Sequence, residues 1–412
     1  MNMMIECNGS DGSDGLSKLG VDLTSYLCSF LNKSDVDTVS LCCKKCYNNT
    51  LKYKFTHFYL KIEYFGEELP PFTRFIIDDD ICESSLDRMS ISAPQTTHLI
   101  LGRKFDYSLV GMSSLVTHLT CGCHFDQSLK GMSPSVKYLT FGKYFNQPLT
   151  GISRFVTHLT FGEQFNQSLE GMSSLLPHLT HLQFGYYFNR SLIGMPQSVK
   201  HLEFGYNFNE SLKGMPSSVS YLIFGDCFNQ SLEKLCYLNL THLTFGRWFN
   251  QPLIGMSVSF PHLTHLTFGH SFDQPLKGMS QLSQLTHLTF GDNFNQSLKG
   301  MPSCVTHLEF GVKFDQPLEG ISPSVTHLRF GYYFNQNLKG ISSLQLTHLK
   351  LGHEFNYSLE EMPRSVVDLT INFNSFGNFN RDLDLYPNLK YINGKLVDRV
   401  VKPQWKKFKL CE

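Results

Sequence analysis

The sequence predicts an α+β repeat protein, in which a small helical domain precedes a solenoid of short parallel β-strands. Two observations predict this fold class. A pattern of 20 to 23 residues recurs thirteen times between His98 and Leu359, and a different pattern, typical of amphipathic helices, occupies residues 19–54. Charge is balanced, with 35 basic and 35 acidic residues, so we expect neither a nucleic acid nor a membrane as partner.

Residues 1–18 are polar and rich in glycine, a composition typical of a flexible leader. They contain no apolar stretch of signal-peptide length, and the chain has no apolar run long enough to span a membrane. The twelve cysteines follow no disulfide framework, which is typical of a reducing compartment. We therefore expect an intracellular, cytoplasmic protein.

The helical segment, residues 19–54, contains two short predicted helices. The first presents an apolar face with spacings of three and four, made of Leu23, Leu27, Phe30 and Leu31. Ser34 is placed to cap a second helix, which carries Val36 and Val39. The spacing alone is also satisfied by a helical cap that shields the first repeat.

Irregular segments flank the repeats on both sides. Residues 55–95 form a junction, in which residues 73–78 predict a degenerate first strand. Residues 362–412 are a degenerate last repeat and a C-terminal cap with a basic tail. In this last part, residues 369–371 continue the strand pattern and residues 379–383 retain part of the core pattern.

Residues 96–361 hold thirteen repeats, each built around one glycine. We call this residue the rung glycine and one repeat a rung. In every rung a leucine stands three residues before the rung glycine, a phenylalanine three after it and a leucine seven after it. A period this short leaves room for one strand and one return turn. The rung glycines are Gly102, Gly122, Gly142, Gly162, Gly185, Gly205, Gly225, Gly246, Gly269, Gly291, Gly311, Gly331 and Gly352.

The rung around Gly291 illustrates the expected geometry. Side chains two apart on a strand share a face, so His287 and Thr289 are predicted to point outward. Gly291 is expected to release the chain from extended geometry, because glycine tolerates backbone angles that other residues resist. The predicted core residues of this rung are Leu288, Phe290, Phe294 and Leu298. Longer rungs carry their extra residues in the return, where added length is tolerated.

The repeat and the helical segment each resemble a known family. The Phe-Asn core of the rungs, as in Phe294-Asn295, resembles the FNIP repeat, a relative of the leucine-rich repeats. This resemblance implies a curved parallel solenoid with its strands on the concave side. The helical segment resembles the F-box in Asp22-Leu23, Leu27-Cys-Ser-Phe-Leu31, Asp35-Val36 and Leu41-Cys-Cys-Lys-Lys-Cys-Tyr47. It departs from the F-box at Leu19-Gly20, where Leu-Pro is usual, and at Cys46, where Trp is usual.

The two resemblances together imply the substrate-recognition subunit of a cullin–RING ubiquitin ligase. The F-box-like segment would dock on a Skp-like adaptor, and so on a cullin, through Leu23, Leu27, Phe30, Leu31, Val36 and Val39. The solenoid would hold a protein target that the sequence does not identify. No enzyme activity and no cofactor are expected. Proteins that join these two parts occur in amoebae and the large viruses that infect them, so the compartment would be the host cytoplasm if the chain is viral. The alternative is a scaffold outside any ligase, with a helical N-terminal cap.

Histidine stands four residues before the rung glycine in eleven of the thirteen rungs, and Tyr138 and Tyr221 replace it in the other two. A zinc site needs a closed ligand set rather than an open row, so we expect a stacked ladder and no metal. Neighbouring imidazoles repel when protonated, which predicts lowered pKa values and a loss of stability at acidic pH. A metal-responsive or pH-responsive binder is the more distant alternative.

Two further columns complete the prediction. The residue after the rung phenylalanine is asparagine in nine of thirteen rungs, too few carboxylates for calcium, so we expect it to hydrogen-bond the turn of the next rung. The outward positions beside the rung glycine vary freely and include aromatic residues and arginine, which is typical of protein-recognition surfaces. The candidate target-binding residues are Tyr186, Tyr187, Tyr206, Arg247, Trp248, Arg329, Tyr332 and Tyr333.

Overall fold

The computed structural model describes residues 59–60, 74–77, 96–232, 239–371, 385–393 and 395–396. The leader and the F-box-like segment lie outside the described residues. The chain divides into two compact units, one formed by residues up to 167 with 174–179, the other by 168–173 and the residues from 180 onward. Each unit is a solenoid of parallel strands joined by return loops, as the sequence predicted.

Among its described residues the first unit contains six strands, each paired in parallel with the next. They are β1 (Tyr59–Leu60), β2 (Arg74–Ile77), β3 (His98–Leu101), β4 (His118–Thr120), β5 (Tyr138–Thr140) and β6 (His158–Thr160). The strand expected over residues 73–78 is confirmed as β2. The two-residue strand β1 was not predicted, because it lies in the junction and carries no repeat signal.

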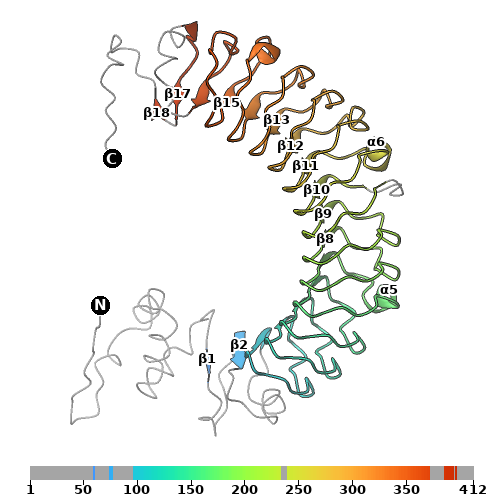
Figure 1. Ribbon diagram of the computed structural model, residues 1–412. Helices are drawn as coiled ribbons and strands as arrows, with labels where there is room; N and C mark the ends of the chain where they lie inside the picture. The colour runs from blue at the N-terminus through green and yellow to red at the C-terminus, as the bar shows by residue number, and fades with distance from the viewer. Residues whose placement is uncertain are drawn as a thin grey trace, which may run out of the picture. The chain divides into compact units, whose positions relative to one another are not determined.

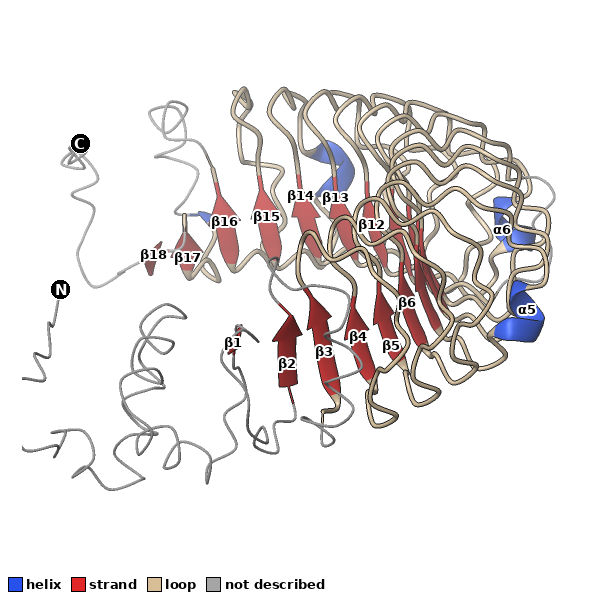
Figure 2. Cartoon of the chain, turned by 90° about the horizontal axis from the view of Figure 1, so that it is seen from below, coloured by secondary structure: helices blue, strands red, loops and turns tan. Residues whose placement is uncertain are grey.

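The described part of the second unit contains twelve strands. They are β7 (His181–Gln183), β8 (His201–Glu203), β9 (Tyr221–Ile223), β10 (His242–Thr244), β11 (His265–Thr267), β12 (His287–Thr289), β13 (His307–Glu309), β14 (His327–Arg329), β15 (His348–Lys350), β16 (Asp368–Thr370), β17 (Tyr391–Ile392) and β18 (Lys395–Leu396). Within the unit each strand pairs in parallel with the next one, except that β18 turns back antiparallel to β17. Within this unit the strands line the inner side of the arc and the return loops lie outside (Figures 1 and 2).

The strands pair in a register that aligns equivalent positions of successive rungs. His287 lies opposite His307, and Leu288 lies opposite Leu308. The same register holds from β12 through β15. Each position of the repeat therefore becomes a column of side chains across the sheet, and a feature of one rung can be judged against its neighbours in the same column.

The core is made of the columns that the sequence predicted. Leu288, Phe290, Phe294 and Leu298 are all buried, with at most 2% of each side chain exposed. The two phenylalanines of a rung stack with centroids 3.9 Å apart, and Phe290 also stacks on Phe310 of the next rung at 5.5 Å. Two more columns, represented by Met301 and Val305, are buried although sequence analysis did not single them out. The return loop thus contributes to the core as well.

The rung glycine was expected to be needed for its backbone angles, and this reason is wrong. Gly291 does not have a left-handed backbone conformation. A Cβ atom placed on it would lie 1.8 Å from the carbonyl oxygen of Gly269 in the preceding rung, so the position requires close backbone approach. Left-handed backbone occurs in a second glycine column nine residues later, for example at Gly300 with φ of 99°.

Extra residues in the longer rungs form helical turns in the return loop. The helix α5 (Met172–Leu175) lies between Gly162 and Gly185, and α6 (Met256–Ser259) lies between Gly246 and Gly269. Both of these glycine spacings are 23 residues. A short 3₁₀ helix, η3 (Lys339–Ile341), occupies a later return loop. The expected tolerance of the return loop for added length is confirmed.

Candidate interaction surface

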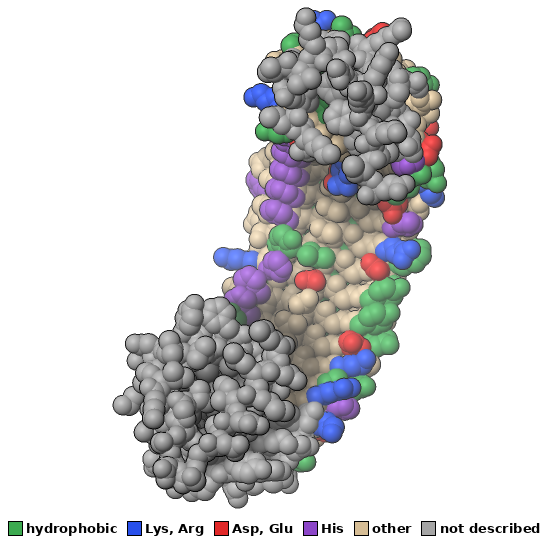
Figure 3. All heavy atoms as spheres, turned by 90° about the vertical axis from the view of Figure 1, so that its left-hand side faces the viewer, with side chains coloured by type: hydrophobic (Ala, Val, Ile, Leu, Met, Phe, Trp, Pro, Cys, Tyr) green, Lys and Arg blue, Asp and Glu red, His purple; other side chains and the backbone are tan. Residues whose placement is uncertain are grey.

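The strand face carries three sets of outward-facing side chains, each defined by its place in the rung. The histidine column lies four residues before the rung glycine. The central column lies two residues before it. The rim comprises the first two residues after it, where the chain leaves the strand. In Figure 3 histidines line one side of the strand face and hydrophobic side chains gather along the opposite edge.

The histidine column is a stacked ladder, as predicted. In the second unit, ring centroids of successive histidines from His287 to His348 are 4.2 Å apart, with interplanar angles of 10° to 13°. Tyr138 takes its place in the same stack, 4.2 Å from His118 and 4.5 Å from His158. Among the residues that the structure describes, no three His, Cys, Asp or Glu side chains are grouped so as to hold a metal ion.

A threonine beside each of these histidines fixes the tautomer of its ring. The Thr286 hydroxyl lies 3.2 Å from the carbonyl oxygen of Thr264 and 2.9 Å from Nδ1 of His287. A hydroxyl has one proton, and the carbonyl can only accept, so Nδ1 must donate to the hydroxyl oxygen. The neutral ring therefore carries its proton on Nδ1, and Nε2 is left as an acceptor. The same pairs of bonds occur at His307, His327 and His348.

The pKa values of four histidines in the ladder are lowered from the ordinary value. They are His201, His265, His307 and His327. Burial against the neighbouring rungs is the larger cause, and repulsion from adjacent imidazoles is the second. The predicted direction of the pKa change is confirmed. Repulsion, which was the expected cause, contributes less than desolvation.

The asparagine column forms the expected hydrogen bonds between turns. The backbone N–H of Asp315 donates to Oδ1 of Asn295 at 2.9 Å, and the side-chain amide of Gln316 donates to the same oxygen at 3.1 Å. Aspartate serves equally as acceptor, since the N–H of Asn335 donates to Asp315 Oδ1 at 2.8 Å. The column is structural, and its aspartates replace asparagine without changing the bond.

The candidate target-binding residues fall into separate groups on the rim. Tyr186 and Tyr206 stack with centroids 4.7 Å apart, and Tyr187 meets Tyr186 edge-on at 4.8 Å. The Arg247 guanidinium lies 5.2 Å from the centre of the Trp248 ring. Both groups belong to the second unit, and one rung, that of Gly225, separates them. Trp248 has 47% of its surface exposed.

A third group lies farther along the second unit. Tyr332 meets Tyr333 at 5.0 Å and stacks on His353 at 4.5 Å. Arg329, the remaining candidate, belongs to the central column and not to the rim. The structure therefore does not gather the eight candidates into one patch, although seven share the rim. Seven of the eight are exposed, as their predicted outward orientation requires, and Tyr206 is half-buried.

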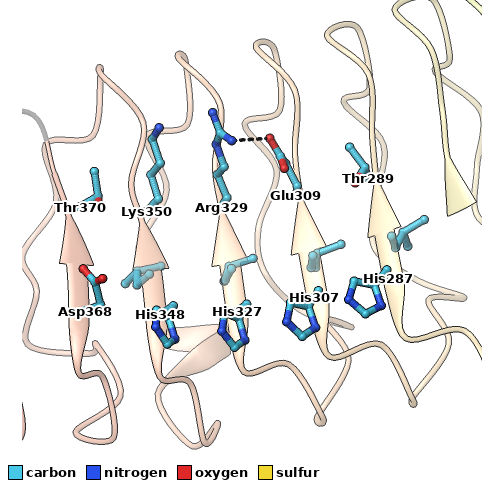
Figure 4. Close-up of a pocket in the computed structure, with 14 residues that line it drawn as sticks. His287, Thr289, His307, Glu309, His327, Arg329, His348, Lys350, Asp368 and Thr370 are labelled. Carbon is cyan, nitrogen blue, oxygen red and sulfur yellow. Dashed lines mark ion pairs between the residues drawn. The ribbon is translucent and has the colours of Figure 1, made fainter. Parts of the chain in front are cut away.

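An open groove of about 370 Å³ crosses the strand face from β12 to β16. Histidines of the ladder line one side and the central column lines the other, with an ion pair of 3.0 Å between Arg329 and Glu309 (Figure 4). Lys350 and Asp368 also line it. Sequence analysis did not single out these last two residues. For Lys350 the signal was present in the central column, where charged residues on three consecutive rungs replace the usual threonine. Asp368 stands in the histidine column, in register with His348.

The adaptor-binding residues predicted from the F-box resemblance lie outside the described residues. They are Leu23, Leu27, Phe30, Leu31, Val36 and Val39. In the part of the chain that is described, burial strongly raises the pKa of the Cys121 thiol, which rules out this residue as an activated nucleophile. No helix within the same part is both long and apolar enough to cross a membrane.

Parallel strands of three residues, a stacked core and a return loop in each rung define a repeat solenoid of the leucine-rich-repeat type. The FNIP repeat model matches residues 125–153, 145–187, 173–207, 188–227, 228–271, 272–313 and 314–344. These segments cover more than half of the chain, and the chain belongs to the FNIP repeat family. No curated protein matches it.

The chain is similar to several solved structures. The structure of CroV588, described as a novel circular leucine-rich-repeat protein, is 30% identical and superposes with a TM-score of 0.54, covering 77% of this chain and 61% of that one. This chain thus spans less than two thirds of that relative. The TLR13–ssRNA13 complex (14% identity, TM-score 0.51, 79% of this chain and 58% of that chain) is similar in fold alone. An internalin from Listeria monocytogenes is 14% identical with a TM-score of 0.43, covering 63% of this chain and 81% of that chain.

Proposed function

We propose that this protein is an interaction scaffold that binds a partner protein on its strand face and rim, and that it is the substrate-recognition subunit of a cullin–RING ubiquitin ligase. The observation that carries the first part is a contrast between columns. The buried columns and the asparagine column hold nearly the same residue in every rung, whereas the rim changes from rung to rung. A surface that varies over an invariant frame supports recognition rather than folding.

The chemistry of the rim favours a protein as the partner. Aromatic side chains offer a large contact area with few rotatable bonds, and arginine can stack and donate several hydrogen bonds. The rim offers both kinds of side chain: the rings of Tyr186 and Trp248 are exposed, and the Arg247 guanidinium lies over the Trp248 ring. The stack of Tyr186 on Tyr206 of the next rung, and the Arg247 guanidinium over Trp248, hold these rings in place before a partner arrives, which lowers the entropy lost on binding.

The ligase part of the proposal is supported by the sequence of residues 19–54. Its apolar positions resemble the F-box, and this chain carries them ahead of the repeats, an order in which one end can dock on an adaptor while the other holds a target. The chain would then contribute proximity between target and ubiquitin-transfer enzymes, and chemistry would belong to those partners.

Affinity capture with and without the N-terminal segment tests the ligase part. The intact chain is expected to retain a Skp-like adaptor and a cullin, and a variant lacking residues 19–54 is expected to lose both. Deleting residues 1–18 instead is the control and should leave the adaptor bound. Absence of the adaptor from the intact chain, or its retention after deletion of residues 19–54, would leave the scaffold outside any ligase.

Rim substitutions test target recognition separately. Tyr186→Asp with Trp248→Asn places in each rim position a residue that the same position holds in other rungs, at Asp226 and Asn293. We expect this double variant to fold and to retain the adaptor. In affinity capture after chemical cross-linking, it should no longer recover the target proteins that the native chain recovers. Tyr357→Gln removes an exposed tyrosine that lies off the rim, and it should have no effect. Equal capture of targets by both variants contradicts the assignment of the rim.

A further inference from the structure

The groove over β12–β16 contains an arrangement of charges found nowhere else in the central column. Arg329 and Lys350 lie directly opposite each other on adjacent strands. Like charges at such cross-strand positions repel, at a strand spacing of about 4.8 Å. Among the thirteen rungs this is the one place where the central column carries like charges in succession. Glu309 neutralises only one of the two cations, from one side.

The histidines opposite this pair complete the lining. Because Nδ1 carries the proton of each neutral ring, Nε2 is an acceptor at neutral pH and becomes a donor when the ring is protonated. His327 and His348 stand on the same strands as Arg329 and Lys350, two residues away and on the same face (Figure 4). On acidification the lining around the two cations thus changes from accepting hydrogen bonds to donating them.

The charged groups facing these two histidines come from three sources. On their own strands they are Arg329 and Lys350. The preceding strand β13 contributes His307 and Glu309, and the following strand β16 contributes Asp368, in register with His348. Glu309, Arg329, Lys350 and Asp368 together sum to zero charge when the histidines are neutral. Each proton taken up by the ladder therefore makes the groove net positive.

We propose that this groove binds an acidic segment of a partner protein, with Arg329 and Lys350 holding two neighbouring carboxylates and His327 adding a hydrogen-bond donor as the pH falls. The inference rests on the proposed function, because it takes the strand face to be the surface that recognises proteins. It goes further by naming the chemistry of the partner and the condition that strengthens binding.

The dimensions of the groove suit a polypeptide. Five strands at about 4.8 Å span roughly 19 Å, which is the length of about six residues of extended chain. The two cations are one strand spacing apart, close enough for carboxylates on neighbouring residues of a bent or extended segment. The acidic residues Glu309 and Asp368 flank the cations on both sides. They would repel a continuous polyanion, which is why a nucleic acid fits less well than a short acidic segment.

The test is fluorescence anisotropy with the full-length chain and a labelled peptide that holds two adjacent aspartates between serines. Its carboxylates stay ionised at about pH 5.5, since aspartate titrates near 3.9. We expect the peptide to bind about tenfold more tightly at about pH 5.5 than at about pH 7.5, the gain available from a few exposed charge pairs. A peptide with asparagines in place of the aspartates should not bind at either pH.

Variants taken from the residues of the array itself separate binding from folding. Arg329→Thr with Lys350→Thr restores the threonine usual in the central column and should weaken binding about tenfold at both pH values. Lys277→Thr with Lys299→Thr removes the same charge from return loops and should leave binding unchanged. His327→Tyr with His348→Tyr retains stacking, as Tyr138 shows, and should abolish most of the acid enhancement while sparing binding at neutral pH.

Three outcomes overturn the inference directly. Equal binding of the aspartate and asparagine peptides, full binding by the doubly threonine-substituted variant, or binding of labelled oligothymidylate in place of the peptide would each do so. Failure of the peptide while the intact chain still captures adaptor and targets would refute the groove and leave the proposed function standing. Peptide binding by a chain that captures no adaptor would refute the ligase part of the proposed function and leave the groove standing.

Discussion

At the scale of single residues, glycines of the two glycine columns can serve different physical purposes, as Gly291 and Gly255 of two different rungs show. A side chain on Gly291 has no room, because its Cβ would lie 1.8 Å from the Gly269 carbonyl oxygen. Gly255, in the second glycine column, has open space around it but a left-handed φ of 78°. The first residue is required by the spacing between rungs, and the second by the path of the return loop.

Alanine substitutions should separate these two requirements. Gly291→Ala forces adjacent rungs apart against close-packed backbone, and we expect it to lower the free energy of unfolding by at least about 2 kcal/mol. Gly255→Ala meets no atom and carries only the cost of a left-handed alanine, about 1 kcal/mol. Urea unfolding followed by circular dichroism measures both. Similar losses in the two variants would mean that backbone angle, and not space, decides the rung position.

The residue scale also shows where sequence reasoning stops. Glycine at every rung could be read from the sequence, but its cause could not. A glycine at the end of a strand is explained equally by backbone angle and by close approach, and only the position of the Gly269 carbonyl distinguishes them. Similarly, the sequence alone does not distinguish Lys350 from other lysines of the repeats. Its place in a pair of adjacent cations follows only from the strand register, which sets Arg329 opposite it.

At the scale of the rung, polar turns are joined to one another by a single side-chain oxygen. Asn295 Oδ1 accepts from the backbone N–H of Asp315 and from the amide of Gln316. The three-residue strands provide few backbone bonds, so this column extends the pairing between rungs into the turn. The sequence predicted this column correctly, because asparagine and aspartate alternate freely while both retain the acceptor oxygen.

Substitution of Asn295 should reveal what the oxygen contributes. Asn295→Ala leaves the Asp315 N–H and the Gln316 amide without this acceptor, and we expect a loss of about 1 kcal/mol in the free energy of unfolding. Asn295→Asp keeps the acceptor, as Asp315 does for the following rung, and should cost much less. The same urea titration compares them. If the aspartate variant is as unstable as the alanine variant, the amide N–H₂ and not the oxygen holds the turn.

At the scale of the whole molecule, the repeat made the fold predictable and left the site open. Leu288, Phe290, Phe294 and Leu298 could be assigned to the core because alternation and period agree in every rung. Recognition depends on residues that depart from the repeat pattern. The meaning of such a residue depends on which side chains of neighbouring rungs lie beside it, and the sequence alone does not give that register. The groove became visible only when the register placed three charged residues of the central column side by side.

The stacked ladder makes stability depend on pH, and the sign follows from the pKa changes. The pKa values of His201, His265, His307 and His327 are lowered in the fold, chiefly by burial. The unfolded chain therefore binds protons first, at its ordinary histidine pKa of about 6.5. Stability from these groups is fully present above that pH, is lost as the pH falls through it, and stops falling once the folded histidines are protonated.

Unfolding by urea at a series of pH values from about 8 to about 5 tests this expectation. The midpoint for the native chain should fall on acidification. A variant with His265→Tyr, His307→Tyr and His327→Tyr keeps the stack, as Tyr138 and Tyr221 do, but has fewer rings to protonate, so its midpoint should fall less. Effects of carboxylates are common to both chains and cancel in the comparison. A native midpoint that stays constant or rises, or an equal fall in the variant, would show that the ladder does not control acid stability.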